Sequence, residues 1–62
     1  MIEERLIFRV DDVVHKPAGY PFPGVVVAAF RTRAGKARYV VEHEDAHGLM
    51  HIFNGKQLAL TT

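Results

Sequence analysis

The 62-residue sequence contains no cysteine, which excludes both a disulfide and a thiolate metal site as a source of stability. It also has no excess of one charge, because eight lysines and arginines face seven acidic residues, so the basic character of a nucleic-acid binder is missing. The longest apolar run, residues 25–30, is too short to cross a bilayer, and residues 1–5 lack the layout of a signal peptide. These absences predict a cytoplasmic protein, and we expect neither a membrane nor a nucleic acid as its partner.

The length of the chain predicts one domain over residues 1–62, with residues 1–4 loosely held. A chain this short buries only about 60% of the surface that its unfolded form exposes, and its core supplies only a few kcal/mol of net stability. Such domains usually need a disulfide, a metal or a partner subunit. With cysteine absent, association with other subunits or unusually tight packing is left to stabilise the fold, and we expect a homo-oligomer.

Stretches rich in β-branched and aromatic residues alternate with turn residues along the whole chain. Strands are expected at residues 5–10, 13–15, 25–33, 38–44, 49–53 and 58–60. Three prolines and a glycine make residues 16–23 an ordered loop, and residues 54–57 are expected to form a single helical turn. This order of a long loop, three hairpin-connected strands, one turn and a closing strand is typical of a five-stranded SH3-like barrel.

Residues 25–30 are apolar at every position, whereas a strand of a small antiparallel barrel should alternate between apolar and polar. Two interpretations remain open for the second face of this strand. It is either an edge covered by the proline-rich loop or a contact between subunits, and an exposed contiguous apolar patch favours the second.

Residues 43–47 spell His-Glu-Asp-Ala-His and match the H-E-x-x-H zinc protease motif. That chemistry needs a helix, because a spacing of four places both imidazoles on one helical face. Here the motif follows a strand and precedes Gly48, so we expect a solvated turn and no metal site. A looser metal site that also uses His51 is the weaker alternative.

The chain also carries a family resemblance, in one ungapped register from residue 12 to residue 58. The matching residues are Asp12, Val14, Lys16, Gly19, Phe22, Gly24, Val27, Thr32, Tyr39, Val41, Glu42, Glu44, Gly48, Ile52 and Leu58. In these positions the sequence resembles the type II (type B) plasmid-encoded dihydrofolate reductases. The resemblance implies a homotetramer of SH3-like barrels around one central pore, NADPH as cofactor, dihydrofolate as substrate and resistance to trimethoprim.

The functional motif of that family is Val-Gln-Ile-Tyr, and it falls on residues 50–53, which read Met-His-Ile-Phe here. By resemblance, His51, Ile52 and Phe53 would form the catalytic and cofactor-binding strand, and Lys16 would attract the phosphates of NADPH and the substrate's glutamate tail. Two residues depart from the family: His51 replaces a glutamine, and Phe53 replaces a tyrosine and so lacks its hydroxyl.

Without the resemblance, the simplest interpretation makes Met50 and Ile52 core residues and places His51 and Phe53 on an exposed face. Two other functions also remain open. Residues 20–23 (Tyr-Pro-Phe-Pro) could form an aromatic groove for an extended peptide, as in a non-catalytic interaction module. A third interpretation, nucleic-acid binding, uses four cations of one hairpin: Arg31, Arg33, Lys36 and Arg38.

Overall fold

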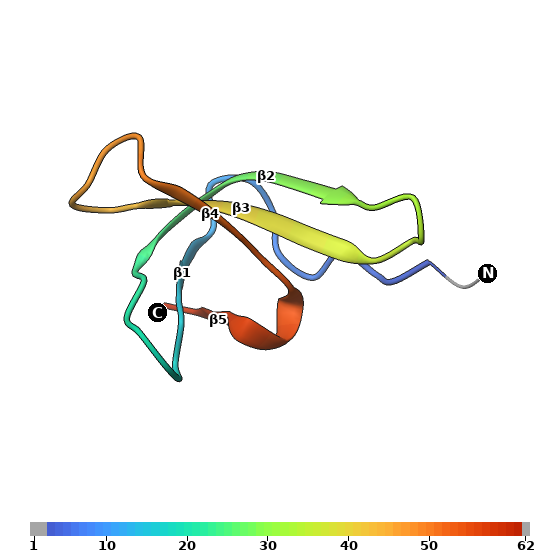
Figure 1. Ribbon diagram of the computed structural model, residues 1–62, viewed down its shortest axis with the longest axis horizontal. Coiled ribbons are helices and arrows are strands. Elements are labelled where there is room, and N and C mark those ends of the chain that lie inside the picture. Colours follow the sequence, from blue (N-terminus) through green and yellow to red (C-terminus); the bar gives the residue numbers. More distant parts are fainter. Residues whose placement is uncertain (1–2, 62) are drawn as a thin grey trace.

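The computed structural model describes residues 3–61 and is built on one five-stranded antiparallel sheet (Figure 1). The strands are β1 (Val13–His15), β2 (Gly24–Arg31), β3 (Ala37–His43), β4 (Met50–Phe53) and β5 (Ala59–Leu60). Their order is β4-β3-β2-β1-β5, so β4 and β5 are the two edges of an open sheet. The all-β class and the order of the elements from residue 13 onward are therefore confirmed. No helix within residues 3–61 has the length and apolar character that crossing a membrane requires.

The long β2–β3 hairpin dominates the molecule and runs along its longest dimension (Figure 1). Its turn is closed by backbone hydrogen bonds from Thr32 to Lys36 and from Gly35 to Thr32. Gly35 has a φ of 80°, a conformation that glycine adopts without steric cost. The connection expected at residues 34–37 is thus real, although β2 ends two residues earlier than expected, at Arg31.

A β-bulge at Val27 interrupts the pairing of β2 with β3, because Val26 faces Val41 and Ala28 faces Val40. The extra residue shifts the alternation of the strand, so residues on both sides of the bulge can point into the core. Val26 before the bulge is fully buried, and Ala29 after it packs against the core. With the bulge, Val26 and Ala29 face the core, while Val25, Ala28 and Phe30 lie on the opposite face of the sheet.

The core lies on one face of the sheet, where it is closed by the residues that precede β1 and by the proline-rich loop. It contains Phe8, Val14, Phe22, Val26, Ala37, Tyr39, Val41, Phe53 and Leu58. Phe8 meets the Tyr39 ring edge-on, with the ring centroids 5.1 Å apart. None of the buried side chains within residues 3–61 is polar or charged apart from the hydroxyl of Tyr39, which has a hydrogen-bond partner.

The prediction of a strand at residues 5–10 is wrong. The strand-forming residues there do alternate in exposure, since Phe8 is buried while Ile7 and Arg9 are exposed. However, the backbone of this segment bonds to side chains instead of a neighbouring strand: the Ile7 amide donates to the hydroxyl of Tyr39 (2.9 Å) and the Arg9 amide to Asp12 (2.9 Å). The segment is an extended cover of the core that never joins the sheet.

The helical turn expected at residues 54–57 is confirmed as a 3₁₀ helix, η1 (Gly55–Gln57). Asn54 caps it: its side chain accepts hydrogen bonds from the amides of Lys56 (2.9 Å) and Gln57 (3.1 Å). The side chain of Gln57 in turn accepts from the Asn54 amide (3.0 Å). This reciprocal capping box turns the chain from β4 towards β5.

Of the N-terminal residues expected to be loosely held, residues 1–2 lie outside the described part of the chain. Glu3 and Glu4 contact the β2–β3 hairpin. The amide of Glu4 donates to the carbonyl of Gly35 (2.8 Å), and its carboxylate accepts from the amide of Ala37 (2.7 Å).

Candidate functional site

Two of the residues expected to bind the cofactor, Lys16 and His51, meet on one exposed aromatic ring. Tyr20, in the proline-rich loop, is 52% exposed. The ammonium of Lys16 lies 4.6 Å from the centroid of its ring, and its hydroxyl is 3.3 Å from Nδ1 of His51. A cation over an aromatic face is attracted by the ring's quadrupole. The loop therefore brings together two side chains that are far apart in the sequence.

Phe22 packs against the ring of His51. The two rings are stacked, with centroids 4.6 Å apart and planes inclined by 24°. Phe22 is buried and also touches Phe53 and His43 edge-on. One face of the His51 imidazole is thus covered by a rigid aromatic side chain, and the residue remains exposed overall. We call Lys16, Tyr20, Phe22 and His51 the aromatic cluster.

Lys16 is positioned by its own loop. Its ammonium donates a hydrogen bond to the carbonyl of Ala18 (2.6 Å), which leaves two of its protons for a ligand. Gly19 makes room for this contact: its φ is 78°, and a Cβ at this position would lie 2.7 Å from the Lys16 nitrogen. The sequence of the loop therefore favours one position of the cation.

The other two residues of the expected site lie elsewhere. Phe53 pairs with Tyr39, is 2% exposed and belongs to the core, so its side chain presents almost no surface to a ligand. Ile52 pairs with Val40 on the opposite face of the sheet and is 62% exposed. The interpretation that made Met50 and Ile52 core and left Phe53 exposed is wrong, because β4 packs on the core through Phe53 and is exposed at Met50 and Ile52.

The face of the sheet that carries Ile52 is apolar and uncovered, and the sequence showed only part of it. Residues paired across antiparallel strands share a face. The pairings place on this outer face Val25, Ala28 and Phe30 of β2, Val40 of β3, and Met50 and Ile52 of β4. Two charged residues of β3, Arg38 and Glu42, lie at its two ends. Val27 and Phe30 stay 38% and 39% exposed, so the interpretation that the proline-rich loop covers this face is wrong.

The H-E-x-x-H letters lie at the end of β3 and in the turn after it, not on a helix. His43 has a structural task there: its Nδ1 accepts hydrogen bonds from the amides of Asp45 (3.1 Å) and Ala46 (3.4 Å). Within residues 3–61, no three histidine, aspartate or glutamate side chains are grouped so as to hold a metal ion.

The four cations of the β2–β3 hairpin are partly matched by acidic residues. Nε of Arg31 lies 3.5 Å from the Glu3 carboxylate, and Nη1 of Arg38 lies 3.9 Å from that of Glu4. The hairpin therefore carries less free positive charge than its sequence indicates.

No protein-family model matches the sequence, and no curated protein sequence matches it. The resemblance over residues 12–58 therefore stays a prediction. The assignment of a function rests on the aromatic cluster and on the outer face of the sheet.

Proposed function

We propose that the chain forms a homotetramer of SH3-like barrels that reduces dihydrofolate with NADPH in a pore shared by the four copies. One observation carries this proposal. Lys16 and His51 both contact Tyr20, and Ile52, which follows His51 in β4, lies on an uncovered apolar face. One chain offers ligand-binding side chains and a surface for assembly on the same short strand.

Self-association is supported by the outer face of β2, β3 and β4. Its centre is apolar, and the two charges at its ends are of opposite sign, Arg38 and Glu42. When two copies meet about a two-fold axis, each surface contacts itself in the reverse direction. Arg38 of one copy then faces Glu42 of the other, and the apolar centres cover one another.

The aromatic cluster suits the two chemical features of NADPH, which are flat rings and phosphates. The lysine ammonium has two protons free for phosphate oxygens, and Tyr20 and His51 offer ring surface for stacking. A cleft of about 540 Å³ in the single chain is lined by neither Lys16 nor His51. A pore shared by several copies would enclose a cofactor bound on the exposed aromatic cluster.

NADPH supplies the hydride in this reaction, and the protein's contribution is to orient the reactants. His51 and Lys16 would hold ligand groups at fixed positions, and orientation alone can supply several kcal/mol of the barrier reduction. The backbone of Ile52 would bind at the pore wall. Phe53 acts through Phe22, with ring centroids 5.2 Å apart, by supporting the ring on which His51 stacks.

Absorbance of NADPH in the presence of dihydrofolate tests the reaction, and sedimentation velocity of the same sample tests the assembly. We expect a tetramer, oxidation that continues in the presence of trimethoprim, and a rise in KM of roughly tenfold for Lys16→Met. Arg33→Met removes a cation at the hairpin tip and should leave KM unchanged. A chain that stays monomeric at every concentration, or a tetramer without NADPH oxidation, would overturn the proposal.

A second function, binding of an extended peptide, is favoured by one observation: Tyr20 is 52% exposed and lies edge-on to Phe22, with centroids 6.3 Å apart. Exposed rings beside proline are a surface on which proline-rich segments dock. A monomer whose Tyr20 and His51 amide signals shift with a proline-rich peptide would select this function instead.

A further inference from the structure

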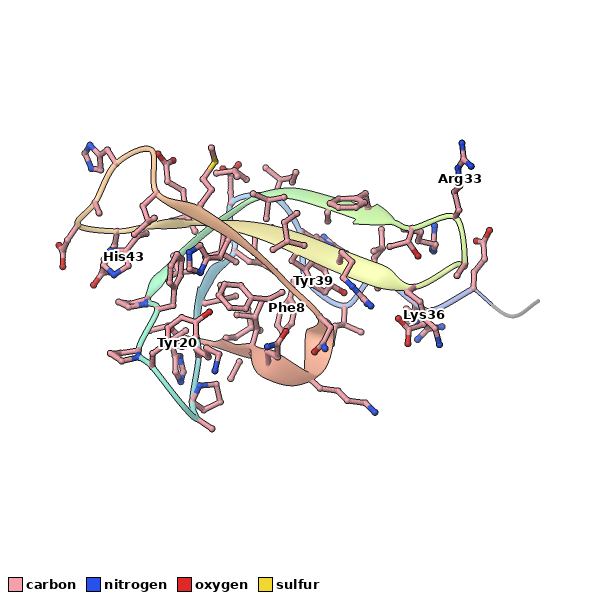
Figure 2. The ribbon with its side chains drawn as sticks, viewed as in Figure 1. Phe8, Tyr20, Arg33, Lys36, Tyr39 and His43 are labelled. Carbon is pink, nitrogen blue, oxygen red and sulfur yellow. The ribbon has the colours of Figure 1, made fainter. Side chains whose placement is uncertain are left out.

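A cleft of about 540 Å³ lies at the opposite end of the molecule from the aromatic cluster. Figure 2 shows Tyr20 and His43 at one end and Lys36 at the other. Three segments form the cleft: the chain before β1, the start of β3, and the turn that leads into η1. The side chains that matter for what it binds are Glu4, Arg5, Ile7, Lys36, Arg38 and Lys56.

The rim of the cleft is strongly basic, with four cations and a single carboxylate. That carboxylate, of Glu4, is engaged by the amide of Ala37 (2.7 Å) and lies 3.9 Å from Nη1 of Arg38. Three cations have no carboxylate within 4.0 Å among residues 3–61: Arg5, Lys36 and Lys56. The cleft therefore carries uncompensated positive charge and attracts an anionic ligand.

The cleft also has an apolar part, formed by Ile7. Ile7 is 58% exposed there, and it packs beside Gly55, where an added Cβ would lie 3.2 Å from its terminal carbon. A ligand that matches both parts has an apolar group for Ile7 and negative charges for the rim. Stacked nucleic-acid bases do not match, because the aromatic ring that borders the cleft, Tyr39, is fully buried.

The chain itself shows how this hairpin binds an acidic segment. The amide of Glu4 donates to the carbonyl of Gly35 (2.8 Å), and Nε of Arg31 donates to the carbonyl of Glu4 (2.9 Å). Glu3 and Glu4 add their carboxylates to Arg31 and to the amide of Ala37. An extended glutamate-containing segment is thus held by backbone and side-chain contacts together.

We propose that this cleft binds an acidic peptide segment of a partner protein, with carboxylates on Arg5, Lys36 and Lys56 and an apolar side chain on Ile7. The site is independent of Lys16 and His51 and does not require the reductase activity. Its ligand is a peptide rather than a nucleic acid. The hairpin already binds the chain's own acidic residues Glu3 and Glu4, and the aromatic ring that lines the cleft is not open for stacking a base.

Fluorescence anisotropy with a labelled peptide of alternating glutamate and leucine tests the site, and a peptide with glutamine at each glutamate is the control. We expect binding of the acidic peptide that weakens with added salt, and no binding of the neutral one. Lys36→Glu and Lys56→Glu should each weaken binding about fivefold, and together more than tenfold. Because each lysine is a surface residue, circular dichroism and the urea midpoint should match the wild type.

Arg33→Glu is the matched control, because it reverses one charge on the same hairpin. Figure 2 shows Arg33 pointing away from the hairpin tip, whereas Lys36 lies on the side where the N-terminal segment runs. Its expected effect is less than twofold, and an effect equal to that of Lys36→Glu would mean diffuse attraction and overturn the site. Tighter binding of a single-stranded oligonucleotide of equal charge, lost in Lys36→Glu, would overturn the peptide assignment.

Amide shifts on titration with the acidic peptide locate the contact directly. We expect them at residues 36–38 and 54–56. Shifts confined to Tyr20 and His51 would place the peptide on the aromatic cluster and contradict the proposal.

Discussion

Ile52→Lys is the sharpest test of the outer face as a contact between copies. Full burial of an isoleucine side chain stabilises by about 1.5–3 kcal/mol relative to exposure. Ile52 keeps 62% of its surface exposed in the single chain, so its burial between copies would add about 1–2 kcal/mol from each copy. A two-fold contact contains the residue twice, which gives about 2–4 kcal/mol, and the lysine ammonium adds a desolvation cost.

Sedimentation velocity over a range of concentrations measures the effect. A loss of about 2 kcal/mol raises the dissociation constant about 30-fold, and the larger figure raises it further. The same substitution should change the free energy of unfolding of the separate chain by no more than about 0.5 kcal/mol, since an exposed side chain makes few contacts. The two measurements together separate a lost interface from a damaged fold.

Leu60→Lys is the control, because Leu60 is 51% exposed but lies in β5, at the other edge of the sheet. We expect it to leave the dissociation constant unchanged. Equal dissociation by both substitutions would show that any added charge has this effect, and a large fall in the urea midpoint of Ile52→Lys would show that the side chain is buried in the single chain. Either result would refute the reasoning.

Three further substitutions test the fold. Gly24→Ala should lose about 3 kcal/mol in urea unfolding, because the new Cβ would overlap the backbone carbonyl of Glu42, and an unchanged midpoint would contradict this close approach. Tyr39→Phe removes the hydroxyl that accepts the Ile7 amide and should cost about 1–2 kcal/mol, with faster hydrogen exchange at that amide as the specific sign. Asn54→Ala removes the cap of η1 and should cost about 1 kcal/mol, whereas Asn54→Asp should retain most of the stability.

Local chemistry is what made much of the fold predictable from the sequence. Gly35 allows the positive φ of a hairpin turn, and Asn54 with Gln57 forms a capping box, so both features follow from residues close together in the chain. The strand over residues 38–44 followed from its β-branched and aromatic residues, of which Tyr39 and Val41 form the inner face of β3. None of these predictions depends on which distant segments of the chain pack together.

The predictions that failed depend on contacts between segments that are far apart in the sequence. Residues 5–10 alternate as a strand does, but a segment joins a sheet only where a strand edge is free beside it. Here the side chains of Tyr39 and Asp12 accept the hydrogen bonds of two amides of the segment instead. In β4 the alternation was readable but not its phase, so Phe53 and Ile52 were given the wrong faces. The contact of Lys16 with His51 through Tyr20 is set by the path of the loop, which no local pattern shows.

The bulge at Val27 has a consequence for chains of related sequence but different length. Val27 is the one residue of β2 that the bulge leaves without a partner in β3, so deleting it would keep Val26 opposite Val41 and Ala28 opposite Val40, and the neighbouring residues would stay on their present sides. The turn at residues 32–36 lies outside the β2–β3 pairing, and its residues other than Gly35 are exposed or partly exposed. Relatives that lack one residue of β2 are therefore expected to lack it at Val27, while other changes of length are expected in the turn.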